Sequence, residues 1–122
     1  MKQKVHSVSY LAKAEFELKN GVYDLVALPC GAEVVKVALE VVGNPTAGNV
    51  SVGFKDKDET TKGYFLTLEV IETNNKNATS AKDYTATSNK VVVAEVKNAN
   101  SNGAKGVLRV LYFLPSVIEV EY

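Results

Sequence analysis

Residues 28–42 read LPCGAEVVKVALEVV, and the predicted fold follows from this stretch. It opens with a corner, because Pro29 has no backbone N–H for a strand ladder and Gly31 accepts unusual backbone angles. Four apolar residues then occupy alternate positions and share one face of a pleated strand: Val35, Val37, Leu39 and Val41. Lys36 and Glu40 fall on the opposite face. This alternation is typical of a half-buried strand in an antiparallel sheet.

Similar patterns recur along the chain. Residues 5–18 alternate, with His6, Val8 and Tyr10 on the apolar side, and predict one long strand or two collinear ones interrupted near Ala12. Because Asn20-Gly21 is a strong two-residue turn signal, we expect this strand and the next to pair as a hairpin. Further strands are expected at residues 22–28, 50–55, 64–71, 90–96, 106–114 and 117–122.

Two regions are less decided by pattern. Residues 64–71, YFLTLEVI, fit either a strand or a short helix, and we favour the strand. Residues 73–89 form the longest polar loop, in which a small strand could lie around Tyr84. Residues 98–106 contain Asn102-Gly103 and are expected to form a hairpin loop before a central strand at 106–114.

The fold class follows from these elements. About eight strands, separated by turn residues and accompanied by no clear helix, predict an all-β protein with an antiparallel β-sandwich of the jelly-roll-like kind. Residues 5–122 are expected to form a single domain, preceded by a short polar arm at residues 1–4.

Composition excludes several function classes. Fourteen basic residues balance fourteen acidic ones, so no net charge attracts the chain to nucleic acid or to a membrane. The single cysteine, Cys30, excludes an internal disulfide. We expect synthesis in a reducing cytoplasm, because neither a signal peptide nor a membrane-spanning run is recognisable.

The residues do not predict an enzyme or a cofactor. A catalytic pair of Cys30 and His6 would need a third, orienting group, and neither residue has an obvious one. One histidine is too few for a metal site or for a cupin-type enzyme. Residues 56–59, DKDE, offer carboxylates to calcium, but they lack the spacing and glycine of a calcium loop. Phe65, Tyr84 and Tyr112 could stack bases, although the scattered lysines argue against nucleic-acid binding.

Residues 22–54 carry a resemblance to small virion proteins of tailed bacteriophages. In that pattern a Leu-Pro-x-Gly-Ala corner leads into an alternating valine strand, a Gly/Thr/Asn loop and a short strand ending in Val-Gly-Phe. The corner is matched here by residues 28–32 and the closing strand by residues 52–54. Cys30 stands where a small residue such as alanine is expected. The middle third of the chain resembles the pattern well, and the rest resembles it loosely.

The resemblance implies a non-enzymatic structural protein of the phage particle, synthesised in the host bacterial cytoplasm. The leading hypothesis is a capsid decoration, or cement, protein on the capsid surface, whose partners are the major capsid protein and further copies of itself in a homotrimer. The alternative is a head or tail fibre module that binds a carbohydrate receptor. Candidate contact residues lie in the arm and in three polar loops: Met1, Lys2, Gln3, Lys4, Asn44, Asn49, Asp56, Asp58, Glu59, Asn75 and Lys76.

Overall fold

The structure, a computed structural model, describes residues 2–43, 45, 47–56, 60–69, 77–100 and 103–121. These residues form strands and connections and contain no helix. The strands are β1 (Lys2–His6), β2 (Ser9–Glu17), β3 (Gly21–Leu28), β4 (Glu33–Val42), β5 (Asn49–Lys55), β6 (Thr60–Glu69), β7 (Asn77–Ser80), β8 (Tyr84–Thr85), β9 (Lys90–Lys97), β10 (Lys105–Phe113) and β11 (Val117–Glu121).

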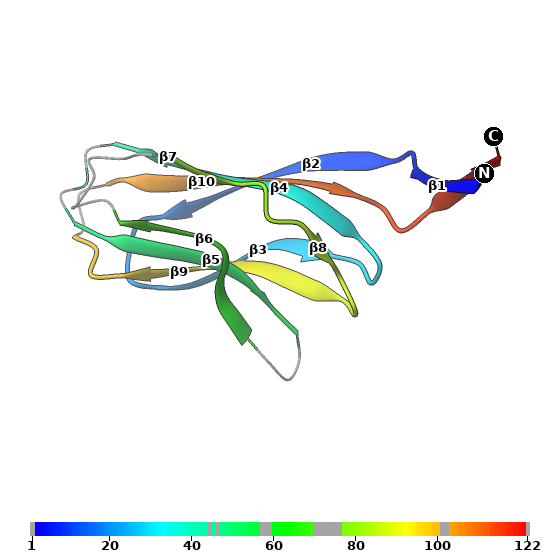
Figure 1. Cartoon of the computed structure of the whole chain (residues 1–122). Helices are drawn as coiled ribbons and strands as arrows, with labels where there is room; N and C mark the ends of the chain where they lie inside the picture. The colour runs from blue at the N-terminus through cyan, green and yellow to red at the C-terminus, as the bar shows by residue number, and fades with distance from the viewer. Residues whose placement is uncertain are drawn as a thin grey trace.

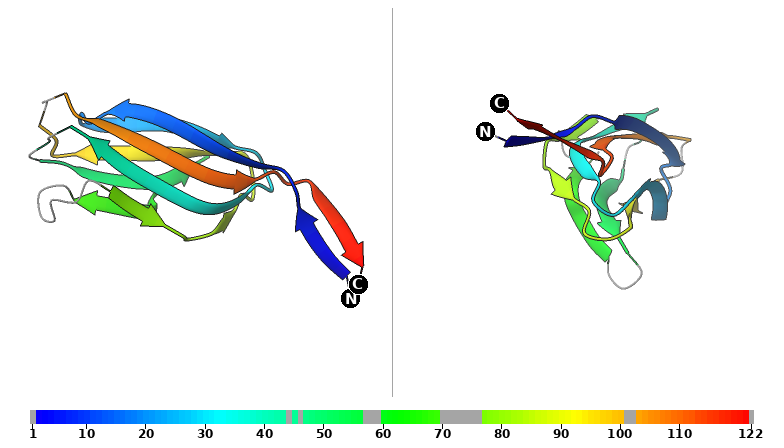
Figure 2. Two further views of the ribbon diagram at one scale, coloured as in Figure 1. Left: turned by 90° about the horizontal axis from the view of Figure 1, so that it is seen from above. Right: turned by 90° about the vertical axis from the view of Figure 1, so that its right-hand side faces the viewer.

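Two antiparallel sheets pack face to face (Figure 1). One sheet has the order β2-β10-β4-β7, with β8 also paired to β4, and the other has the order β3-β9-β5-β6. Strands β1 and β11 pair only with each other and form a ribbon that leaves one end of the sandwich (Figure 2). The predicted all-β antiparallel sandwich is therefore confirmed. The described strands exceed the predicted number because residues 5–18 divide between β1 and β2 and because β7 and β8 form inside the expected loop.

The core lies between the two sheets and consists of aliphatic and aromatic side chains. No polar or charged residue is buried among the residues that the structure describes. The largest fully buried side chains come from both sheets: Leu18, Leu28, Leu39, Leu108, Val34, Val37, Val50, Val52, Val92, Val96 and Val110. Strand β10 pairs with both β2 and β4, as expected of a central strand. The strand predicted at residues 64–71 is confirmed by β6, and its last two residues lie outside the described ranges.

The corner after β3 is built as its residues predict. Gly31 adopts a φ of 87°, in the left-handed region that favours glycine. Its N–H donates to the carbonyl oxygen of Ala86 at 2.7 Å, and the N–H of Ala32 donates to the carbonyl of Pro29 at 3.0 Å. The corner is thereby held to the segment after β8.

Two predicted hairpins are wrong. Strands β2 and β3 lie in different sheets, and so do β9 and β10, so neither pair forms a hairpin. Of the second turn signal, Asn102 lies outside the described residues. The cause is burial at the end of β2: Leu18 is in the core, and its N–H donates to the carbonyl of Ala104 at 3.0 Å. The side-chain oxygen of Asn20 then accepts the N–H of Ala99 at 2.9 Å and joins the two crossings.

The predicted alternation in β4 is wrong at its beginning. Val35 was expected to face the core, but it is 39% exposed, whereas Val34 is fully buried. The register against β10 shifts there, from Lys36 opposite Leu111 to Val34 opposite Tyr112. Val35 is therefore the extra residue of a β-bulge, which reverses the two faces at that point. From Val37 onward the predicted face is buried.

Gly53 lies at a close approach between β5 and β6. The register of this pair shifts between Val52 and Phe54, so that Gly53 has no direct partner on β6. A Cβ at position 53 would lie 2.0 Å from the backbone carbonyl oxygen of Thr61. Backbone cannot give way as a side-chain tip can, so only glycine fits here.

We expect Gly53→Ala to lower the free energy of unfolding by about 1–3 kcal/mol, because the strands must separate to admit the methyl group. Urea unfolding followed by circular dichroism measures the change. The matched control is Ala27→Ser, which adds one heavy atom to an exposed position of β3 and should shift stability by less than about 0.5 kcal/mol. Equal stability of the two variants would contradict the close approach.

Candidate interaction surfaces

The side chains best suited to chemistry are engaged with the backbone. The thiol of Cys30 donates to the carbonyl oxygen of Thr87 at 3.5 Å. The Nδ1 atom of His6 lies 3.0 Å from the carbonyl oxygen of Leu114, at the root of the ribbon. Within the described ranges, no group of three or more His, Cys, Asp or Glu residues could hold a metal. Of the segment considered for calcium, only Asp56 is described, and it pairs with Lys90 at 2.6 Å.

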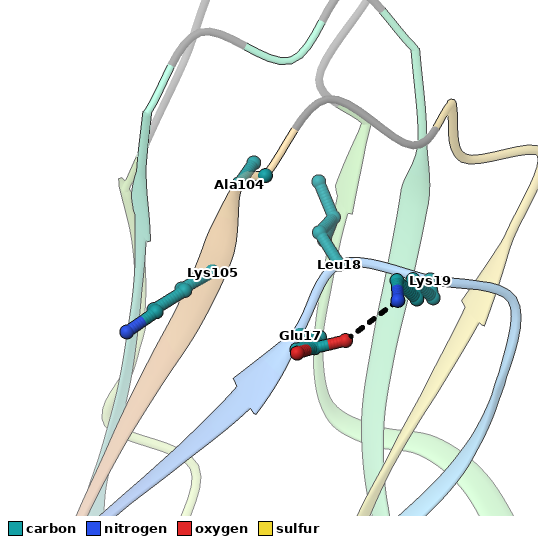
Figure 3. Close-up of a pocket in the computed structure, with 6 residues that line it drawn as sticks. Glu17, Leu18, Lys19, Ala104 and Lys105 are labelled. Atoms are coloured by element: carbon teal, nitrogen blue, oxygen red, sulfur yellow. Dashed lines mark ion pairs between the residues drawn. The ribbon is translucent and has the colours of Figure 1, made fainter.

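A hollow of about 310 Å³ lies between the end of β2 and the beginning of β10 (Figure 3). Its charged side chains are Glu17, Lys19 and Lys105, and Glu17 and Lys19 form an ion pair at 2.9 Å. The hydrogen bond from Lys19 lowers the pKa of the Glu17 carboxyl, and the same bond raises the pKa of Lys19. Each group is thus held in its charged form, which suits neither for proton transfer near neutral pH.

The aromatic rings named as possible stacking platforms pack inside the fold. Tyr84 stacks on Phe54 with ring centroids 4.2 Å apart, and Phe65 and Tyr112 are buried. Tyr64 contacts Phe54 edge-on at 5.1 Å, and the ammonium of Lys82 lies 3.9 Å from its ring centroid. These contacts tie β8 to β5 and β6. They leave no open row of rings of the kind that a bound sugar or nucleotide would need.

The predicted contact residues do not converge on one surface. Lys2, Gln3 and Lys4 lie in β1, and Asn49 begins β5 at the opposite end of the sandwich (Figure 1). Asp56 follows β5 and is half-buried beside Lys90. The other six lie outside the described residues: Met1, Asn44, Asp58, Glu59, Asn75 and Lys76.

Exposed apolar side chains gather where β2 enters the sandwich. Val8, Tyr10 and Leu11 are 40%, 50% and 65% exposed. Val8 and Tyr10 are on the face predicted to be buried, but β2 reaches further toward the ribbon than β3 does (Figure 1), so the opposite sheet does not cover them. Tyr10 touches the ring of Tyr112, with centroids 5.8 Å apart. Leu11 projects from the other, outer face of β2. We name Val8, Tyr10 and Leu11 the overhang. Alternation alone could not reveal the exposure of Val8 and Tyr10, because it depends on where the other sheet ends.

Several charged side chains on the sandwich form ion pairs with a neighbour of opposite charge. Glu95 on β9 accepts from Lys62 at 2.8 Å and from Lys97 at 3.2 Å. Hydrogen bonds from these two lysines lower the pKa of the Glu95 carboxyl. Glu40 on β4 lies 3.5 Å from Arg109 on β10. The described part of the chain has no helix that could span a lipid bilayer.

Comparison with known proteins places this fold among the chains of phage capsids. A chain in the acidic stable capsid structure of Helicobacter pylori bacteriophage KHP30 is 75% identical, over 100% of both chains, with a TM-score of 0.90. Chains of the cyanophage Pam1 capsid asymmetric unit and the Ralstonia phage GP4 capsid share the fold at lower identity. The Pam1 chain is 19% identical, with 88% of this chain and 85% of that chain covered and a TM-score of 0.59. The GP4 chain is 17% identical, with 92% of this chain and 88% of that chain covered and a TM-score of 0.65. No protein-family model and no curated protein matches.

The all-β sandwich and the full-length match to a chain of a phage capsid structure define a structural protein of the bacteriophage virion. More particularly, the chain belongs to the same family as the KHP30 capsid chain, because the two are 75% identical over their full lengths. Its place is the phage particle, where capsid assembly implies association with copies of itself and with other capsid components.

The pH dependence of stability can be tested at Glu95. Because its folded-state pKa is lowered, its ionised form stabilises the fold above the ordinary carboxyl pKa, and this contribution disappears as the pH falls through the lowered value. We therefore expect Glu95→Gln to lower the melting temperature at neutral pH and to match the wild type at about pH 2. Calorimetry at both pH values measures the difference. The control is Glu15→Gln, an exposed carboxylate on β2. A Glu95→Gln deficit that persists unchanged in acid would contradict the role of these ion pairs.

Proposed function

We propose that this protein is a capsid decoration, or cement, protein that binds the outer surface of the shell and stabilises it. The observation that carries the proposal is the full-length match, at 75% identity, to a chain of the KHP30 capsid. The absence of a metal cluster and of an open aromatic platform in the described residues agrees with a role based on contact rather than on chemistry.

The topology suits such a role. Apart from the β5–β6 pair and the short β7 and β8, consecutive strands of the sandwich lie in different sheets, and this crossing supports the proposed jelly-roll-like arrangement. A doubly layered sheet with an interior of close-packed valines is stiff. It can therefore transmit load between the shell proteins that it bridges without deforming.

Exposed large apolar side chains lie at both ends of the described sandwich. The overhang lies beside the ribbon, and Val35 is near it, because β4 begins where β10 runs toward β11. Val22 and Val42 are exposed at the opposite end, where β3 begins and β4 ends. The open edge of β2 carries Lys13, Glu15 and Glu17, charges of the kind that discourage edge-to-edge pairing. This distribution supports apolar contacts with other proteins at the ends of the sandwich rather than along the edge of β2.

The energetic effect comes from repetition. Stable protein interfaces bury about 1,600 Å² in total, and apolar burial contributes about 25 cal/mol per Å². Each copy that spans neighbouring shell proteins adds such a contact to the closed shell. The proposed partners are the major capsid protein and the other copies in a homotrimer. The contact residues named from the sequence, and the division into an arm of residues 1–4 and a domain of residues 5–122, stay predictions.

Electron cryomicroscopy of the virion tests the proposal. We expect density for this fold on the outer face of the shell, and we expect particles stripped of the protein to keep a closed shell that releases its DNA at a lower temperature. Adding the purified chain back should restore the release temperature. Density embedded as a tile of the shell, or on its inner face, would refute the decoration role.

A further inference from the structure

The ribbon of β1 and β11 has two open edges. In the described structure each of its strands pairs only with the other. The outer edge of each strand therefore presents backbone N–H and C=O groups without a neighbouring strand. A two-stranded ribbon on its own is marginally stable in water, and open edges are ready templates for a further strand.

The two edges carry opposite charge. Strand β1 brings Lys2 and Lys4, and the register sets them opposite Glu121 and Glu119 on β11. The ammonium of Lys2 also lies 3.6 Å from the carboxylate of Glu119. One edge of the ribbon is thus a basic strand and the other an acidic strand, in a chain whose net charge is zero.

This charge pattern selects how two copies can meet. If β1 met β1 of a second copy, lysines would face lysines, and if β11 met β11, glutamates would face glutamates. Like charges placed directly opposite destabilise a strand pair, whereas opposite charges stabilise it. Pairing of β1 with β11 of the next copy sets Lys against Glu and repeats the pairing that already exists inside the ribbon.

The geometry of that contact is cyclic. A rotation about an axis along the ribbon leaves all β1 strands parallel to one another and all β11 strands opposed to them. Each β1 is then antiparallel to the β11 of its neighbour, as it is to its own. Contacts of this head-to-tail kind close into rings when the rotation closes.

The overhang continues this surface toward the sandwich. Tyr10 and Val8 follow the ribbon directly in sequence, and Val8 accepts the N–H of Leu114 at 2.8 Å where the two terminal strands leave the sandwich. A second copy docked at the ribbon would bring its own ribbon root beside these exposed side chains. In the single chain this apolar surface is exposed, and docking of a second copy would bury it.

We infer that the terminal ribbon is the element through which copies of this chain associate, with β1 of one copy pairing with β11 of the next in a closed ring. The inference rests on the proposed function only in assuming that copies associate. The partner is a second copy of this chain, and recognition depends on the Lys2 and Lys4 edge meeting the Glu119 and Glu121 edge.

A charge-swapped chain tests the inference. The variant K2E/K4E/E119K/E121K keeps every Lys–Glu pair inside its own ribbon and between copies of itself. Against the wild type, however, both junctions would place like charges opposite each other. We expect each chain alone to form oligomers of the same size, and mixed oligomers to fall about tenfold or more below statistical mixing. Native mass spectrometry of the two chains, refolded together, counts the mixed species. The exclusion should weaken in about 1 M salt, where the screening length is about 3 Å.

Hydrogen exchange of the wild type tests the inference even if the charge-swapped variant fails to fold. In the wild type, backbone amides of β1 and β11 should exchange hydrogen more slowly in the oligomer than after dilution to the monomer. Free mixing of the two chains, unchanged amide exchange, or a wild type that is monomeric at every concentration would each overturn the inference.

Sedimentation of each chain with stripped shells separates the inference from the proposed function. Free mixing by chains that still bind the shell would refute the ribbon alone. Exclusion by chains that do not bind the shell would support the ribbon and refute the decoration role.

Discussion

The structure depends on one pairing, that of the edge strand β2 with β10 in one of the two antiparallel sheets. Strand β10 is held between β2 and β4, and its core-facing residues Leu108 and Val110 are fully buried. Because β2 and β10 are antiparallel neighbours, the chain before β2 and the chain after β10 leave the sandwich at the same end. The two terminal segments are thereby brought together and pair as β1 and β11 (Figure 2). The ribbon is therefore a consequence of strand pairing in the sandwich.

Packing in the rest of the sandwich follows from the same pressure to bury apolar residues from both sheets. Where strict alternation would have turned a valine outward, the backbone inserts an extra residue, as at Val35. Where two strands come too close for any side chain, glycine is present, as at Gly53. The ends of the strands are joined by side chains of loop residues, such as Asn20 and Asn89, which bind backbone N–H groups of Ala99 and Cys30. These few local irregularities fix one register of the strands around a core made largely of valine and leucine.

Sequence patterns predicted the elements of this fold better than their partners. The alternation of residues 37–41 is confirmed, because periodicity reports burial directly. The strand favoured over a helix at 64–71 is confirmed as far as residue 69, and the central strand predicted at 106–114 is confirmed as far as residue 113. The turn at Asn20-Gly21 was located, yet its strands lie in different sheets, since a turn signal does not say which sheet the next strand joins. The overhang could not be predicted for a related reason: Tyr10 has the same pattern as Phe16, and only the length of the opposite sheet distinguishes them. The resemblance in residues 22–54 pointed correctly to a virion protein. It consists of apolar strand residues and turn residues, and these contain no information about a docking partner.

The pairing of β2 with β10 also sets the order of events during synthesis. Phe16 lies opposite Gly106, so almost the whole described chain must leave the ribosome before β2 can meet its partner. Until then the valine faces of β4 and β5 have no complete sheet around them. The local pairing of β5 with β6 can form early, but β3 and β4 belong to different sheets and cannot complete either sheet locally. Folding is therefore comparatively slow, as expected when native contacts join distant parts of a chain. In an infected cell, chains whose valine faces are still uncovered would be exposed to chaperones and proteases in the meantime.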